Sequence, residues 1–158
     1  MPTEPLWHVM LHARPGRPPA PRGVTVRGRS AVSGWDELSA TEQTAPFPVA
    51  FEAAAADLSR LPNLYFEPDG SFCWVGPRLA WQFGGQLTDY GGRLVHVELR
   101  GHGTPERWQA LATAVAGPGP RLAVQLVEAA VYLDWDDFLA LVDGDGGPTP
   151  SPGIAGQS

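Results

Sequence analysis

The chain has 158 residues, of which 43% are hydrophobic, and this suits a single domain with a substantial core. Its formal net charge of −6 argues against nonspecific binding to nucleic acid, because neutralising phosphates requires a basic surface. A single cysteine excludes an internal disulfide bond, no apolar run approaches the ~20 residues of a membrane-spanning helix, and the first residues lack a secretory signal pattern, so we expect a cytoplasmic protein.

Charge is distributed unevenly along the sequence. Residues 1–35 hold five arginines and one glutamate, whereas residues 122–158 hold six acidic residues and no basic residue. These two regions are able to attract each other or a partner, and solvated surfaces explain the same pattern.

Short strands and loops are predicted at the N-terminal side. Residues 6–12 and 24–27 are predicted as strands. Between them, residues 13–23 are rich in proline and arginine, which predicts an extended loop or linker because proline fixes φ and removes a backbone donor. Residues 28–46 are polar and are predicted as a long loop. Within that loop, Trp35 is either an anchor for a partner or a cap on the edge of the core.

Three helices are predicted further along the chain. Apolar side chains repeat at helical spacing in residues 49–61, directly after a proline, and again in residues 106–117. Thr104 supplies the N-cap of the second helix. A last short helix is predicted at residues 135–142, where Asp134 is the cap and the acids that follow favour a helix N-terminus.

The stretch YFEPDGSFCWVG predicts a β-hairpin. Its Pro-Asp-Gly sequence at residues 68–70 suits a tight turn, because proline presets φ and glycine accepts positive φ. This turn pairs Glu67 with Ser71 and Tyr65 with Cys73, and it leaves the other face of the hairpin fully apolar. Cys73 is therefore expected on the second face as a buried or half-buried thiol.

A second hairpin is predicted from clean alternation of apolar and polar residues. Its strands are residues 81–89 and 94–100, joined by a turn that contains two glycines. If Asp89 pairs with Arg93, the polar face has two further pairs, Gln86–His96 and Gln82–Arg100. Gly84 and Gly85 inside the first strand indicate a bulge, a close backbone approach, or packing under an aromatic ring.

The C-terminal part of the chain contains one ambiguous segment. Residues 121–133 fit both a strand and a helix, and a strand to about residue 127 is favoured. Residues 143–158 are rich in glycine and proline, which predicts a disordered tail. We therefore expect one α+β domain over residues 1–142, in which an antiparallel β-meander sheet has two or three helices packed on one face.

The polar face of the predicted sheet is the best candidate for a functional surface. It presents five candidate ligand- or partner-binding residues: Gln82, Gln86, His96, Glu98 and Arg100. Cys73 and His96 share this face, but a third strand separates their strands. Two strand spacings come to roughly 9.6 Å, whereas a nucleophile and its base need about 2.6–3.2 Å. No catalytic residue is therefore expected, and an enzyme is the less favoured interpretation.

Metal and cofactor sites are not expected. His8 and His12 have i,i+4 spacing, but on a strand this separates them by about 13 Å. The sequence has no HExxH or CxxC pattern, no phosphate-binding glycine loop and no complete calcium loop.

Three runs of sequence carry a resemblance: LPNLYFEPDGSFCWVG, WQFGGQLTDYGGRLVHVELRG and QLVEAAVYLDWDDF. Over about residues 61–138 the chain is similar to uncharacterised hypothetical proteins of planctomycete-type bacteria. That group has no established activity, so the resemblance implies a bacterial cytoplasmic setting and implies no catalytic residue and no ligand.

Three functions agree with these patterns. The favoured one is a non-catalytic protein–protein interaction or regulatory module that binds a protein partner through the polar sheet face or the Trp35 loop. The second is a small-molecule-binding protein or modest hydrolase that uses His96, Glu98 and Arg100, and a deep pocket with a shifted histidine pKa would favour it. The third is a structural homo-oligomer that self-associates through an exposed strand edge.

Overall fold

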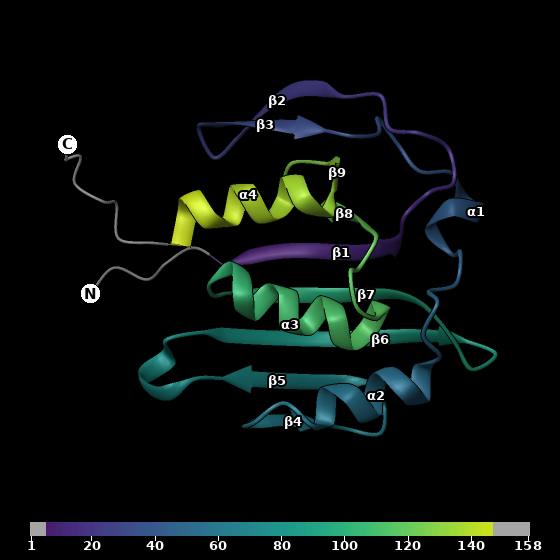
Figure 1. The fold of residues 1–158 in the computed structure, drawn as a ribbon, viewed down its shortest axis with the longest axis vertical. Coiled ribbons are helices and arrows are strands. Elements are labelled where there is room, and N and C mark those ends of the chain that lie inside the picture. Colours follow the sequence, from purple (N-terminus) through teal and green to yellow (C-terminus); the bar gives the residue numbers. More distant parts are fainter. Residues whose placement is uncertain (1–5, 147–158) are drawn as a thin grey trace.

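A seven-stranded antiparallel sheet forms the centre of the computed structural model, which describes residues 6–146 (Figure 1). The strands lie in the order β4-β5-β6-β7-β1-β8-β9. Their bounds are β1 Trp7–Ala13, β4 Leu64–Phe66, β5 Ser71–Val75, β6 Gln82–Tyr90, β7 Arg93–His102, β8 Leu122–Leu126 and β9 Val131–Asp134. The predicted α+β class is confirmed. The N-terminal strand β1 lies between β7 and β8, so it joins the meander to the C-terminal hairpin.

Helices cover one face of this sheet (Figure 1). They are α2 Phe51–Ser59, α3 Pro105–Ala116 and α4 Trp135–Gly146. The last helix continues past the boundary predicted at residue 142, and the remainder of the predicted tail lies outside the described residues. Within residues 6–146, no helix is long and apolar enough to cross a membrane.

A cluster of aromatic side chains joins the helices to the sheet. Trp108 of α3 is fully buried and meets Phe83 of β6 edge to face, with 4.8 Å between the ring centroids. It also meets Phe138 of α4 at 5.0 Å, and Phe138 in turn meets Trp7 of β1 at 5.9 Å. Residues at helical spacing on two helices and at alternate positions on two strands therefore converge on one core.

The region predicted as a long loop contains regular structure. Its elements are β2 Arg22–Val26, β3 Arg29–Ser33 and α1 Ala40–Gln43. β2 and β3 form a separate two-stranded sheet, and both Arg27 and Gly28 in the turn between them have positive φ. The prediction of a long loop over residues 28–46 was wrong because β3 is a mostly polar strand with little apolar alternation, and α1 has no buried residue to mark it.

The basic N-terminal region pairs with the acidic C-terminal region of the same chain. Arg14 donates two hydrogen bonds to the Asp134 carboxylate, at 3.1 and 2.9 Å. Arg27 donates two to the Glu128 carboxylate, at 3.1 and 3.0 Å. Bidentate pairs of this kind fix both side chains. The proline-rich stretch that starts after β1 is therefore a loop tied to β9 rather than a free linker.

The two predicted hairpins differ in how well the sequence indicated their register. The β4–β5 register agrees with the prediction. In β6–β7 the predicted faces are correct except at Leu94, which was predicted on the polar face and lies in the core, and the partners are displaced by two positions. The observed pairs are Gln86–Glu98 and Gln82–His102, in place of Gln86–His96 and Gln82–Arg100. The turn at Gly91 and Gly92 pairs Tyr90 with Arg93 and accounts for one position of the displacement, and a bulge between Thr88 and Asp89 accounts for the other.

Two further boundaries differ from the sequence-based expectation. Residues 121–133 include a strand, as favoured, but the chain then turns and forms the second strand β9. The turn contains Ala130, whose φ is +55, and it has no glycine or proline from which a turn could have been predicted. Helix α2 begins after Ala50 rather than directly after Pro48.

Candidate functional site

The sheet face opposite the three long helices is covered only in part. Residues 34–47, which include α1, fold over this face where it is formed by β8 and β9. Trp35 and Leu38 pack there with Ala123 and Tyr132, and Trp35 is only 1% exposed. This corrects the expectation of an exposed anchor at Trp35: the side chain caps the edge of the core, the second of its two predicted roles.

Two histidines meet at the covered corner of this face. The Nδ1 atom of buried His12 lies 3.2 Å from the Gln43 carbonyl oxygen, and Nε2 lies 2.9 Å from Gln125 Oε1. The ring centroid of His96 is 6.1 Å from that of His12. Burial lowers the pKa of His96, and nearby His12 lowers it further, against a weaker opposing effect of Glu98. His96 is therefore mainly neutral at pH 7.

The stability of the fold is expected to decrease as the pH falls below 6.5, the ordinary pKa of histidine, towards the lowered pKa of His96. In that range the unfolded chain binds more protons than the folded chain, so acid favours unfolding. Urea midpoints measured at pH 7.5, 6.5 and 5.5 should decline for the wild type and decline less for His96→Gln. Parallel declines in the two proteins would contradict this assignment.

Strand pairing aligns side chains in rows across the rest of this face. One row runs His8, Arg100, Gly84, Cys73 and Tyr65, from β1 to β4. The adjacent row runs Met10, Glu98, Gln86 and Ser71. Three of the five candidates on the predicted strands therefore come together, and the other two lie in the flanking rows. The three are Gln86, Glu98 and Arg100, and the flanking two are Gln82 and His96.

His8 belongs to this group although the sequence did not single it out as a binding residue. Its Nε2 atom lies 2.6 Å from Glu98 Oε2, and the same oxygen lies 3.9 Å from an Arg100 nitrogen. The three side chains are 25%, 36% and 64% exposed, respectively. Alternation in β1 places His8 on the polar face, but no local pattern shows that β7 is the neighbour of β1.

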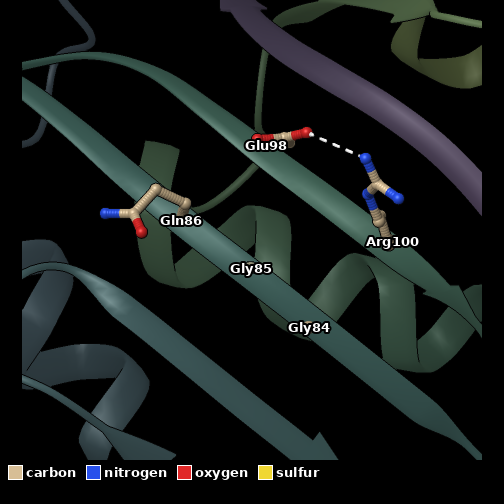
Figure 2. Close-up of a pocket in the computed structure, with 5 residues that line it drawn as sticks. All are labelled: Gly84, Gly85, Gln86, Glu98 and Arg100. Atoms are coloured by element: carbon tan, nitrogen blue, oxygen red, sulfur yellow. Dashed lines mark ion pairs between the residues drawn. The ribbon is translucent and has the colours of Figure 1, made fainter.

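A hollow of about 250 Å³ lies above β6 on this face (Figure 2). We call it the Gly84 hollow, and it is lined by Gly84, Gly85, Gln86, Glu98 and Arg100. A Cβ atom added to Gly84 would meet no atom within 4 Å. One added to Gly85 would lie 2.2 Å from the ring of Phe72 in the core. The first glycine therefore leaves space on the surface, and the second leaves space for an aromatic side chain.

A second hollow, of about 340 Å³, lies beside the first row. It is lined by Asn63, Tyr65, Cys73, Val75, Gly76 and Pro77. Tyr65 is 72% exposed and Cys73 is also exposed, which corrects the expectation of a buried or half-buried thiol. In the adjoining turn, Arg78 and Leu79 have φ of +53 and +58, a backbone conformation that costs free energy in residues other than glycine.

The structure does not bring the thiol of Cys73 next to the imidazole of His96. Cys73 lies on β5 and His96 on β7, with β6 between them, and the ladder partner of Cys73 is Gly84. Among the described residues, no three His, Cys, Asp or Glu side chains are grouped so that they could hold a metal ion.

The site offers groups suited to binding. It presents an exposed guanidinium at Arg100, oxygen acceptors on Gln86 and Glu98, and an exposed aromatic ring at Tyr65 two strands from the Gly84 hollow. Such groups recognise a ligand or a partner surface through hydrogen bonds and apolar contact. Comparison of the chain with protein-family models, with curated proteins and with solved structures gave no match, so the function is inferred from this site alone.

Proposed function

We propose that this protein is a non-catalytic protein–protein interaction module, and that it binds its partner through the open face. The open face is the side of β4–β7 away from the helices (Figure 1). It presents Tyr65, Cys73, Gly84, Gln86 and Arg100. One observation supports this function most directly. The helices pack on the other side of these strands, and residues 34–47 cover the sheet at β8 and β9, so the side chains of the open face remain exposed or half-exposed.

The dimensions of the open face suit a protein partner. β6 and β7 are 9 and 10 residues long. At ~3.3 Å per residue and ~4.8 Å between strands, the four strands span about 30 Å by 15–19 Å at their longest. Because β4 and β5 are short, the projected area is on the order of 450 Å², and the side chains standing on it add accessible surface. One partner in a standard protein interface buries about 800 Å².

A small-molecule-binding function has weaker support. The hollow of about 250 Å³ lies below the roughly 300–1,000 Å³ of typical ligand pockets, and the hollow of about 340 Å³ lies at the lower end of that range. His96, one of the residues assigned to this function, does not line either hollow. This second candidate is favoured by the convergence of Glu98 and Arg100 on one hollow and by the lowered pKa of His96.

Self-association through a strand edge also has weaker support. At one edge of the sheet, the backbone N–H groups of Gly34 and Trp35 donate to the carbonyl oxygen of Tyr132 on β9, at 2.8 and 3.4 Å. At the other edge, β4 has three residues. Pairing between sheets needs a long row of free backbone groups, and a short edge strand provides few.

The test is co-purification of protein partners from native cytoplasm at low salt, followed by mass spectrometry. Tyr65→Arg places a bulky cation on the open face, whereas Tyr90→Arg makes the same change at a tyrosine that is 81% exposed at the tip of the β6–β7 hairpin. We expect a stoichiometric partner to be lost with Tyr65→Arg and retained with Tyr90→Arg, because tyrosine is enriched among the residues that contribute most to affinity at an interface.

Two outcomes would contradict this function. One is a partner that both variants retain equally. The other is a wild-type protein that is recovered without a partner and carries a small molecule in native mass spectrometry, which would favour the second candidate.

A further inference from the structure

We propose that the Gly84 hollow is the anchor point for a side-chain carboxylate of the partner, an aspartate or glutamate bound by Arg100. This inference rests on the proposed function, because it names the chemistry with which the open face recognises a protein. It follows from the availability of the guanidinium, the space above Gly84, and the charges around the hollow.

Arg100 is available to a new ligand. Its side chain is 64% exposed, and it forms an ion pair with Glu98 at 3.9 Å, a separation too long for a hydrogen bond (Figure 2). Glu98 is held instead by His8, at 2.6 Å. The planar guanidinium therefore retains donors that match the two oxygens of a carboxylate, and such bidentate pairs are among the stronger hydrogen-bonded contacts in proteins.

The hollow has room for a carboxylate, and one of its walls is held in place by hydrogen bonds. No atom lies within 4 Å of a Cβ position on Gly84, which is the ladder partner of Arg100. Figure 2 shows Gln86 further along β6, while Glu98 and Arg100 lie side by side on β7. The Gln86 amide nitrogen donates to the carbonyl oxygens of Asp69 and Leu87, at 2.9 and 3.0 Å, so this side chain is held in place.

The surrounding charges favour a carboxylate over a phosphate. A phosphate group carries about −1.5 to −2 charges at neutral pH, and Glu98 would repel it more strongly than it repels a carboxylate. Asp136 and Asp137 belong to α4, which packs on the side of the sheet opposite the open face (Figure 1). Charges separated by more than ~8 Å are largely screened at physiological salt, so the net charge of the chain has little influence on this local contact.

A side-chain carboxylate is favoured over a chain terminus. Sites that capture a C-terminal carboxylate commonly use a nest of free backbone N–H groups. Around the Gly84 hollow, β6 is paired with β5 on one side and with β7 on the other, so its backbone groups are committed to the sheet.

The experiment is a titration of the full chain, observed by NMR, with N-acetyl-aspartate amide as the probe and N-acetyl-asparagine amide as the neutral control at equal ionic strength. We expect shifts of the Gly84 and Gly85 amides and of the Arg100 Nε–H group with the first probe only. A single contact of this kind has a dissociation constant on the order of millimolar.

Three variants test the geometry of this contact. Arg100→Gln should weaken binding at least about tenfold, because the charge and the bidentate donors are lost. Gly84→Val places a branched side chain in the hollow, where its Cβ would meet no atom within 4 Å, and it should also abolish the shifts. Glu98→Gln removes the nearby negative charge and should tighten binding about three- to tenfold. Thermal unfolding of each variant checks that the fold is retained.

The proposal is overturned if the asparagine probe produces the same shifts, or if binding persists in Arg100→Gln. Co-purification separates this result from the proposed function. If Tyr65→Arg loses the partner while Arg100→Gln and Gly84→Val keep it, the open face binds a protein and the carboxylate anchor is wrong. If the aspartate probe binds but none of the variants loses a partner, the hollow does bind a carboxylate. The proposal that this carboxylate belongs to a protein partner is then wrong.

Discussion

Replacement of Trp108 by alanine is expected to lower the free energy of unfolding by about 3–5 kcal/mol. Trp108 is fully buried, and its ring contacts Phe83 on the sheet and Phe138 on α4, with centroids 4.8 and 5.0 Å away. Truncation would therefore leave a cavity where α3, α4 and the sheet meet. Single domains have about 5–15 kcal/mol of stability in total, so this one change removes a large part of it.

Urea unfolding measures the effect as a change of midpoint at constant slope. Tyr90→Ala is the control, because an 81% exposed side chain is expected to change stability by no more than about 0.5 kcal/mol. Trp108→Phe should cost less than Trp108→Ala: it keeps an aromatic ring, and it removes a buried Nε1–H group that has no acceptor within the described part of the chain. A loss below about 1 kcal/mol for Trp108→Ala would contradict its central position in the core.

Gly101→Ala is expected to destabilise the fold by about 3 kcal/mol or more, at the upper end of the range for overpacking. An added Cβ would lie 2.2 Å from the backbone oxygen of Gln82 and 2.8 Å from the Cα of Phe83. Those atoms belong to β6, the ladder neighbour of β7, and they cannot move without displacing the strand. The alanine would therefore force β6 and β7 apart at this position.

The three glycines Gly84, Gly85 and Gly101 form a matched series for this prediction. Gly84→Ala should be neutral or slightly stabilising, by up to about 0.5–1 kcal/mol, because space is free and glycine in a strand carries an entropic cost. Gly85→Ala should fall between the two, at about 1–3 kcal/mol, since its Cβ meets the side chain of Phe72, which is able to shift. Equal unfolding midpoints for Gly84→Ala and Gly101→Ala would contradict the structure.

Local sequence was sufficient where a turn and an alternating pattern agree. The Pro-Asp-Gly turn places Tyr65 opposite Cys73, as predicted, because residues 68–70 set both the direction and the register of the hairpin. In the β6–β7 hairpin, alternation assigned Gln82, Gln86, His96, Glu98 and Arg100 to the correct face, but Leu94, predicted on the same face, lies in the core. Alternation did not reveal the two-residue turn or the bulge at Thr88, and each displaced the predicted polar partners by one position.

The candidate site was also predicted only in part from the sequence. Gln86, Glu98 and Arg100 were assigned to one surface from strand alternation, and the structure brings them to one hollow. His8 was missed because its partner Glu98 is 90 residues away in the sequence. Trp35 was ambiguous for a related reason: the residues that bury it lie on β8 and β9, almost a hundred residues later.

The sequence by itself determined the α+β class, the strand faces and the tight turn at residues 68–70, because these depend on period-two alternation and on the φ preferences of proline and glycine. Only the tertiary structure decided that β1 inserts between β7 and β8, and with that the pairing of His8 with Glu98 beside Arg100. It also decided which part of the polar face is buried by residues 34–47. Strand order and the coverage of a face arise from contacts between segments far apart in the chain, and no local pattern encodes them.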